Sequence, residues 1–365
     1  MSYQIEKLKN IALIKTGKLD SNAAVSDGTY PFFTCDPITL KIDDWAYDTE
    51  AVLLAGNNAS GNYTAKYYKG KFNAYQRTYI IESANTSLLS VRFLAFAITQ
   101  QLRLLKAMST GSTTKFLTIK MLNDLEIPCP EITTQRKIAS IIGSYDDLIE
   151  NNQNQIKLLE EIAQRLYKEW FIDLRFPGHE NVEIVDGVPV KWHYKSLKEI
   201  STLRAGGDKP KNFSKTPDSK HSIPIYSNGT VNDGLYGYTD MAEITDDSIT
   251  ITARGSIGYT CLRREPYVPI VRLISIIPNM IDVIYLFLSL KNQEFDSNGA
   301  AQQQLTVPMV SDYTVLIPDK GVLNNFLKIV YPIFEKIDLL KYQLLGLVEA
   351  RDRLLPKLIS GEIEV

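Results

Sequence analysis

Apolar residues recur three and four positions apart over a long stretch in the middle of the chain. Between Gln135 and Phe171 the sequence has one glycine and no proline, and its apolar positions form a stripe that Asn152 interrupts. The stripe comprises Ile138, Ile142, Tyr145, Ile149, Ile156, Leu159, Ala163, Leu166 and Trp170. This pattern predicts one helix of roughly 55 Å, at about 1.5 Å per residue, which is longer than an ordinary globular domain needs. We interpret the helix as a spacer.

A second stretch near the other end of the chain, Leu323 to Ser360, has the same apolar period and gives the first helix a partner. A shift of 188 positions places Ile149 on Ile337. The segments before the helices follow the same shift, since Gly111, Leu117, Thr118, Met121 and Pro130 fall on Gly299, Leu305, Thr306, Met309 and Pro318. The chain is therefore a tandem duplication in which each copy ends in a long helix. Because the second helix must return toward the first copy, we expect antiparallel packing.

We predict a fold of the α/β (α+β) class, with two globular domains separated by two long antiparallel helices that form a coiled coil, in a pseudo-twofold internal repeat. The expected boundaries are 1–132 for the first domain, 133–176 for the first spacer helix, 177–320 for the second domain and 321–365 for the second spacer helix. We call the two domains the first head and the second head. Their sequences match less regularly than the helices: Ile251 to Tyr259 echoes Leu53 to Asn62 after a drift in spacing.

Bulk composition describes a globular chain. With 365 residues, of which 44% are apolar and 22% charged, it can bury two cores. The start carries no apolar signal segment and the apolar runs are too short to span a bilayer, so we expect a cytoplasmic protein. Three cysteines and three histidines show no metal-ligand spacing, so neither a metal site nor a disulfide is expected. The net charge of −2 argues against binding nucleic acid by bulk electrostatics alone.

Local charge in the first head is different. Between Ala55 and Lys120, nine basic residues are accompanied by one acid, Glu82, and tyrosines are interleaved with them. Such a surplus indicates a face for a polyanion, because Lys and Arg neutralise phosphates while Asn, Ser and Thr contact phosphates or base edges. The alternative is a strand with a solvated basic face and tyrosines in its core. The basic residues are Lys66, Lys69, Lys71, Arg77, Arg92, Arg103, Lys106, Lys115 and Lys120.

Polar loops at equivalent places differ between the copies. The loop Ser109 to Lys115 is rich in hydroxyls, and its partner Ser297 to Gln304 is rich in amides. Loops that differ in this way suit two domains that recognise different nucleic-acid sequences on one scaffold. The alternative is that both are ordinary surface loops. Between Ala253 and Lys320 basic and acidic residues balance at six each, so we expect binding by the second head to depend more on partners. Its basic candidates are Arg204, Lys209, Lys211, Lys215, Lys220, Arg254, Arg263 and Arg264.

Catalytic motifs are missing from the sequence. It contains no GxxxxGK[ST] phosphate loop, no HExxH and no nucleophile with an adjacent base. Pro217 to Lys220 and Pro318 to Lys320 resemble nuclease fragments but lack the second carboxylate element. Gly255 to Gly258 is too short for a dinucleotide loop and is more typical of a turn. We therefore predict that the chain is not an enzyme.

The order of two variable heads and two long helices resembles the specificity subunit of type I restriction-modification systems. The resemblance covers essentially the whole chain. Its sharpest parts are Gln135 to Ala139 (QRKIA), Leu166 to Asp173 (LYKEWFID) and Leu354 to Ile363 (LLPKLISGEI). The segments Thr110 to Lys115 and Gly70 to Arg77 are also similar to the family. The second helix departs from the pattern, since it lacks the QRK start.

The resemblance implies two target-recognition domains, each of which reads one half of a bipartite site in double-stranded DNA. The helices would set the gap between the halves and dock two methyltransferase (modification) subunits and two restriction/translocase subunits. No cofactor would bind this chain, because S-adenosylmethionine, ATP and Mg belong to the partner subunits. The rival interpretations are a stand-alone nuclease or methyltransferase with duplicated recognition domains, and an adaptor whose heads bind proteins.

The candidate DNA contacts are polar and basic residues of the turns and loops described above. In the first head they are Asn57, Asn58, Lys66, Lys69, Lys71, Gln76, Arg77, Ser112, Thr113 and Lys115. In the second head they are Arg204, Lys209, Lys211, Arg254, Ser256, Tyr259, Gln302 and Gln303. The predicted helix seam comprises Ile142, Tyr145, Ile149, Asn152, Leu159, Leu166, Trp170, Ile337, Leu340, Leu347, Leu354 and Leu358. Asn152 either sets the register of the seam or is an exposed position.

Overall fold

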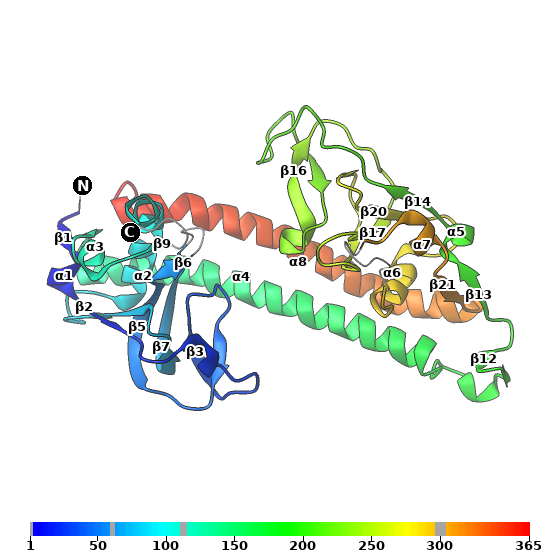
Figure 1. The fold of residues 1–365 in the computed structure, drawn as a ribbon, viewed down its shortest axis with the longest axis horizontal. Coiled ribbons are helices and arrows are strands. Elements are labelled where there is room, and N and C mark those ends of the chain that lie inside the picture. The colour runs from blue at the N-terminus through cyan, green and yellow to red at the C-terminus, as the bar shows by residue number, and fades with distance from the viewer. Residues whose placement is uncertain (1–2, 59–62, 110–114, 296–303) are drawn as a thin grey trace. The chain divides into compact units, whose positions relative to one another are not determined.

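The computed structural model describes residues 3–58, 63–109, 115–295 and 304–365. The chain divides into two compact units, of which the first comprises Met1–Gln153 with Tyr342–Val365 and the second comprises Asn154–Lys341. Each unit therefore contains one head and part of each long helix. These helices are α4 (Ile132–Tyr167) and α8 (Lys320–Ser360) (Figure 1).

Both long helices lie close to their predicted ranges. The α-helical geometry of α4 ends at Tyr167, where a π-helical turn, η2 (Lys168–Ile172), continues the chain. α8 runs without a break through Gly346, where an added Cβ would meet nothing within 4 Å. The helix is therefore uninterrupted although glycine is a poor helix former.

The helices run antiparallel within each unit, as predicted. In the first unit, Arg351 Nη1 lies 2.9 Å from Asp146 Oδ1, so a late residue of α8 meets an early residue of α4. In the second unit, the rings of Tyr167 and Phe326 have their centroids 6.4 Å apart, so a late residue of α4 meets an early residue of α8.

A six-stranded sheet forms the centre of the first head (Figure 1). Its order is β2-β8-β5-β7-β3-β4, and β3 and β7 are its one parallel pair. Successive side chains of a strand point to opposite faces, so Val52 and Leu54 lie on one face and Ala51 and Leu53 on the other, and all four are buried. The strands are β2 (Ala12–Thr16), β3 (Tyr30–Phe33), β4 (Leu40–Ile42), β5 (Tyr47–Ala55), β7 (Ala65–Ala74) and β8 (Thr78–Ser83).

Helix α2 (Val91–Met108) packs against the Val52 face of this sheet. Ser90 caps it, because the Ser90 hydroxyl accepts a hydrogen bond from the Phe93 amide at 3.4 Å. Shorter elements complete the head. They are β1 (Ile5–Lys7), α1 (Leu8–Ile11), η1 (Ser21–Ala23), β6 (Asn57–Asn58), β9 (Lys115–Phe116), α3 (Ile119–Asn123) and β10 (Glu126–Pro128), with β1 paired to β10 and β6 to β9.

The second head has two main sheets, of order β14-β20-β17-β18 and β16-β15-β19. Their strands are β14 (Ser201–Ala205), β15 (Ile223–Tyr226), β16 (Leu235–Thr239), β17 (Ser248–Ile251), β18 (Thr260–Arg263), β19 (Val268–Pro269) and β20 (Ile274–Pro278). The other elements are η3 (His179–Asn181), β11 (Ile184–Val185), β12 (Val188–Pro189), β13 (His193–Ser196), α5 (Leu197–Ile200), η4 (Val231–Gly234), α6 (Val283–Lys291), α7 (Val307–Ser311) and β21 (Thr314–Ile317).

Hydrogen bonds show that the heads are copies of one fold. The Leu8 amide donates to the Leu125 carbonyl at 2.8 Å, and the Leu197 amide donates to the Tyr313 carbonyl at 2.9 Å. The long strand β7 of the first head corresponds to two strands of the second, since β18 pairs with the central strand and β19 pairs parallel with β15. Pro266 lies between β18 and β19, and proline cannot donate a hydrogen bond within a sheet. The predicted fold class and internal repeat are confirmed.

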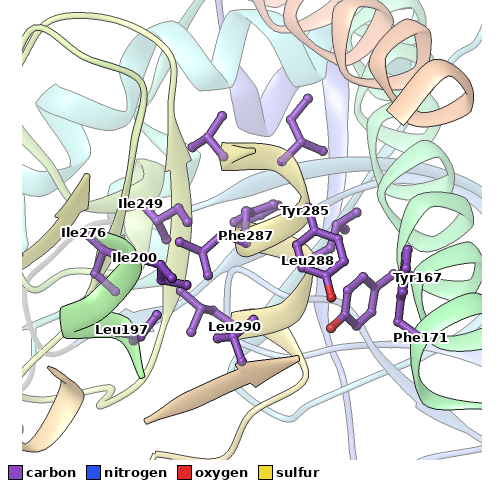
Figure 2. Packing of buried hydrophobic residues seen from close by; sticks show 14 of the residues in the cluster. Tyr167, Phe171, Leu197, Ile200, Ile249, Ile276, Tyr285, Phe287, Leu288 and Leu290 are labelled. Atoms are coloured by element: carbon purple, nitrogen blue, oxygen red, sulfur yellow. The ribbon is translucent and has the colours of Figure 1, made fainter. Parts of the chain in front are cut away.

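The core of the second unit is rich in aromatic residues (Figure 2). Tyr167 and Phe171, from α4 and the π-helical turn that follows it, pack against Tyr285 of α6, with ring centroids 5.5 and 4.9 Å apart. Phe326 of α8 is fully buried beside the same rings. The long helices are therefore part of the core of the head.

This packing changes the interpretation of the predicted seam. Ile142 and Leu358 lie in the core that holds α2 and the sheet of the first head, whereas Trp170 and Ile337 lie in the core of the second head. The apolar stripes therefore serve the heads as well as the pairing of the helices. Asn152 is 6% exposed, so the interpretation of this residue as an exposed position is wrong.

Candidate nucleic-acid interface

An equivalent backbone hydrogen bond lies at the end of the central strand in each head. In the first head the Leu117 amide donates to the Gly56 carbonyl at 2.8 Å, and in the second head the Leu305 amide donates to the Ala253 carbonyl at 3.0 Å. Leu117 and Leu305 are 188 positions apart, which is the period of the repeat. The residues that follow the two acceptors, Asn57 and Arg254, therefore occupy equivalent positions.

Asn57 lies among several predicted contacts of the first head. It pairs with Phe116 in the short ladder of β6 and β9, so Lys115 lies beside it in the ladder. The Arg77 carbonyl accepts from the Gly56 amide at 2.8 Å, which brings the turn between β7 and β8 to the same end of the sheet. The Arg77 side chain is exposed there. The fold thus gathers Asn57, Arg77 and Lys115 from three separate segments.

The lysines of β7 do not form a single basic face. Lys69 and Lys71 share one face of the strand, whereas Lys66 projects from the other, because successive side chains alternate. Lys69 lies 3.3 Å from Glu50, and the ammonium of Lys71 lies 4.5 Å from the ring centroid of Trp45. The prediction of one basic face is therefore wrong for Lys66, whereas Lys69 and Lys71 share a face and are both exposed.

Lys66 has partners within its own head. Its ammonium donates to the Asp36 carbonyl at 3.2 Å and to the Thr39 hydroxyl at 3.0 Å. Burial lowers the pKa of Lys66, and the nearby Asp36 carboxylate partly offsets this effect. The loop that contains Asp36 and Thr39 is thereby held against β7. Gln76 is engaged in a similar way, since its amide donates to the Asp20 carboxylate at 2.6 Å.

Arg254 of the second head is exposed and oriented by an amide. Its Nε and Nη2 atoms donate to Gln304 Oε1 at 3.1 and 2.9 Å. Asn228 holds the backbone below it, accepting from the Ala253 amide at 2.7 Å and donating to the Val271 carbonyl at 2.6 Å. Hydrogen bonds thus hold both the backbone and the guanidinium at this position.

The turn after Arg254 is closed by one threonine. The Thr252 hydroxyl accepts from the Tyr259 amide at 2.9 Å and donates to the Ser256 carbonyl. Gly255 and Gly258 have φ values of +71° and +83°, a backbone region that favours glycine. These constraints present the exposed Ser256 on a tight turn, as the sequence predicted for this glycine-containing segment.

Two residues of the second head that were predicted to contact DNA are hydrogen-bonded to other residues of the protein. Arg263 is 5% exposed, and its guanidinium donates to the Thr250 hydroxyl at 3.0 Å and the Asp233 carbonyl at 2.6 Å. The Tyr259 hydroxyl donates to the Asp233 carboxylate at 2.8 Å. Burial and this bond raise the pKa of the Tyr259 hydroxyl well above its ordinary value. The prediction that Arg263 contacts DNA is wrong, because a buried guanidinium cannot reach a phosphate.

Other basic residues of the second head fall into two groups. Arg264 is paired with Asp338 at 2.6 Å within the second unit. Lys209 and Lys215 instead lie over aromatic rings, 3.5 Å from the Phe213 centroid and 3.7 Å from the Tyr236 centroid. These lysines are exposed, as are Arg204, Lys211 and Lys220.

Several predicted contacts lie outside the part of the chain that the structure describes. These are Ser112, Thr113, Gln302, Gln303 and the side chain of Asn58. Sequence reasoning missed Gln304 and Asn228, which support Arg254. The repeat of 188 positions could have indicated Gln304, because it places this residue on Phe116, just before the equivalent pair Leu305 and Leu117. No sequence signal indicated Asn228.

No group of three or more His, Cys, Asp or Glu side chains in the described ranges is placed to hold a metal ion. The described helices include none that is long and apolar enough to cross a bilayer.

Comparison with known proteins then decides the family. The family model described as type I restriction modification DNA specificity domain matches residues 2–161 and again residues 189–350. The chain belongs to this family. The two matches coincide with the two copies of the repeat, so each copy is one specificity domain of the family.

Individual members of the specificity family are similar over different lengths. The specificity subunit of the type I restriction enzyme EcoDI from Escherichia coli is 29% identical over 247 residues, which cover 61% of this chain and 54% of that protein. A putative type I specificity subunit of Mycoplasma pneumoniae is 28% identical over 327 residues, covering 87% of this chain and 85% of its own. The solved S subunit from M. genitalium shares the fold, with a TM-score of 0.67, 18% identity and coverage of 98% of this chain and 96% of that one.

Proposed function

We propose that the chain is the DNA sequence-recognition subunit of a type I restriction-modification enzyme. Each head reads one half of a bipartite target in double-stranded DNA, and the long helices set the gap between the halves. The observation that carries the proposal is the repeat itself: one fold occurs twice, with Asn57 in one copy and Arg254 in the other at the same strand end. Asn and Arg are residues that recognise bases, and they recognise different ones.

Exposed basic residues of both heads are candidates for phosphate contacts. Arg77 is exposed near Asn57, and Lys209 and Lys211 are exposed on the second head. Phosphate contacts fix the orientation of a protein on the duplex, while base contacts supply the sequence information. We assign Arg77, Lys209 and Lys211 to the first role, and Asn57 and Arg254 to the second.

The chain works as a non-catalytic part of an assembly with methyltransferase and restriction subunits. Exposed apolar residues on the long helices supply docking positions for them. Tyr342 and Leu345 of the first unit are 76% and 72% exposed, and Leu158 and Ile162 of the second unit are 57% and 52% exposed. Each pair is three or four residues apart, so its members lie on one helix face. We propose that two methyltransferase subunits bind these faces and that two restriction subunits join through them.

Cofactor chemistry belongs to the partners in this proposal. S-adenosylmethionine, ATP and Mg are bound by the methyltransferase and restriction subunits, and this chain binds none of them. The assembly acts on cytoplasmic DNA.

Methylation mapping tests the recognition role. Cells that express this chain with its methyltransferase partner should carry methylated bases in one motif of two short specific halves and a non-specific gap. Cells with the partner alone should lack the motif. A methylated motif that persists without this chain would contradict the proposal, since the partner would then recognise DNA by itself.

A paired substitution tests the docking faces. Tyr342→Glu with Leu345→Glu should abolish copurification with the methyltransferase subunit and leave the melting temperature within a few degrees, because both residues are exposed. The matched control is Val231→Glu with Met241→Glu, which places the same two charges on apolar residues of the second head that are 79% and 76% exposed. Normal assembly of the Tyr342 and Leu345 variant would exclude this face as the docking site.

A further inference from the structure

Arg254 differs from Arg264 and Arg351 in the way its guanidinium is held. Arg264 is neutralised by Asp338 at 2.6 Å and Arg351 by Asp146 at 2.9 Å, whereas Arg254 donates to the neutral amide oxygen of Gln304. Within the described part of the chain, no carboxylate lies within salt-bridge distance of Arg254. Among the described residues, its positive charge is therefore oriented but not cancelled.

The geometry of this contact leaves a definite set of donors free. A guanidinium carries five N–H groups, and Gln304 Oε1 accepts from Nε and from one hydrogen of Nη2. The two N–H groups at the outer edge, between Nη1 and Nη2, point away from Gln304. They form a planar fork that can donate two parallel hydrogen bonds to one ligand.

The comparison of the two heads points to a base as that ligand. The residue equivalent to Arg254 is Asn57, and Gln304 is equivalent to Phe116, which pairs with Asn57 in the sheet. Asn is the usual bidentate partner of adenine, and Arg is the usual bidentate partner of guanine through its N7 and O6 atoms. The equivalent backbone position thus carries Asn in the first head and Arg in the second, and these two residue types discriminate between adenine and guanine.

The support beneath Arg254 also suits base recognition. Asn228 holds the Ala253 amide at 2.7 Å, and Thr252 closes the turn that follows. A base edge must be met with correct direction and plane, whereas a phosphate accepts donors from many directions. A fork whose direction is fixed by hydrogen bonds is therefore matched to a base edge.

From these observations we infer that Arg254 reads a guanine in the half-site recognised by the second head and that Gln304 is its positioning residue. The inference rests on the proposed function, and it adds the identity of a base and the pair of residues responsible for it.

The test uses the assembled methyltransferase complex and the duplex identified by methylation mapping. Each guanine of the second half-site is replaced in turn by 7-deazaguanine, which lacks the N7 acceptor. One replacement should weaken binding by the unaltered complex about tenfold or more. The same replacement should have little further effect on a complex with Arg254→Ala, because the partner of N7 is already gone. Gln304→Ala should reduce the discrimination between the two duplexes and leave the salt dependence unchanged.

Lys209→Ala is the matched control, since it removes an exposed positive charge from the same head. It should weaken binding to both duplexes equally and reduce the slope of the salt dependence. Arg254→Ala behaving in this way would overturn the inference and make Arg254 a phosphate contact. A second half-site with no guanine on either strand would overturn it as well. Selective binding that survives Arg254→Ala unchanged refutes the inference alone, whereas absence of any selective binding by the unaltered complex refutes the proposed function.

Discussion

Asn152 Nδ2 donates a hydrogen bond to Gln343 Oε1 at 3.4 Å, which joins α4 to α8 within the first unit. Asn152 is buried, whereas Gln343 is exposed. A polar residue in an apolar seam costs stability but restricts which pairing of the helices is favourable.

We predict that Asn152→Leu makes the first unit more stable. Leucine would gain about 1.5–3 kcal/mol from burial. The lost hydrogen bond is worth about 0.5–1.5 kcal/mol. Because Gln343 is exposed, water can replace its partner, so the net gain should be about 1 kcal/mol. Denaturant unfolding of the purified chain measures this change. Gln343→Ala should instead lower stability by about 1–3 kcal/mol, because it leaves the buried Asn152 amide without its partner. A loss of more than about 1 kcal/mol in Asn152→Leu would show that the polar contact is required for packing.

The aromatic cluster of the second unit should depend on α8. Phe326 is fully buried and its ring centroid lies 4.9 Å from that of Phe171 and 5.6 Å from that of Trp170. Phe326→Ala should therefore lower the free energy of unfolding by about 3–5 kcal/mol, since it removes these contacts and leaves a cavity. Tyr342→Ala, on an exposed part of the same helix, is the control and should cost little. Equal effects of the two substitutions would contradict the assignment of Phe326 to the core.

Lys66 and Arg77 should respond differently to truncation, although the sequence grouped them. Arg77→Ala should weaken DNA binding across all sequences and reduce the slope of log K against log salt by about one unit, because one phosphate contact is lost. Lys66→Ala should change the slope little and lower the melting temperature, because its ammonium holds the Asp36 and Thr39 loop. Binding at several salt concentrations and a thermal melt distinguish these results. A reduced slope for Lys66→Ala alone would reverse the two roles.

Exchange of a whole unit should change one half of the recognised site. Ile138 and Ile142 of α4 and Leu358 of α8 belong to the core of the first head, so a replacement of residues 1–130 alone would place a foreign core on native helices. Replacing residues 1–153 and 342–365 together with those of another family member keeps that core intact. Methylation mapping should then find a new first half and an unchanged second half. A change in both halves would refute independent reading by the two heads.

Lengthening both helices should lengthen the gap in the DNA site. Seven residues inserted after Asn152 and seven after Leu340 fall near the boundary between the units and preserve the apolar period. The insertion adds about 10 Å at about 1.5 Å per residue. At about 3.4 Å per base pair this equals roughly three base pairs. Methylation mapping should find the same halves further apart. An insertion into α4 alone should abolish methylation, and an unchanged gap in the double insertion would mean that the partner subunits set the spacing.

The sequence by itself determined the repeat, the long helices and the family. Apolar periods of three and four residues specify a helix face directly, and the shift of 188 positions places Leu117 on Leu305 before any contact is known. Both signals lie in the order of residues along the chain, so neither depends on a contact in the folded protein.

The tertiary structure decided which charges are available to a ligand. Arg263 and Arg254 both lie in the same run of sequence, yet one is buried against Thr250 and the other is exposed beside Gln304. Lys66 and Lys69 lie three residues apart on one strand but project from opposite faces. These outcomes depend on partners 13 to 50 residues away in the chain, because burial and hydrogen bonding are set by segments that meet only in the folded protein.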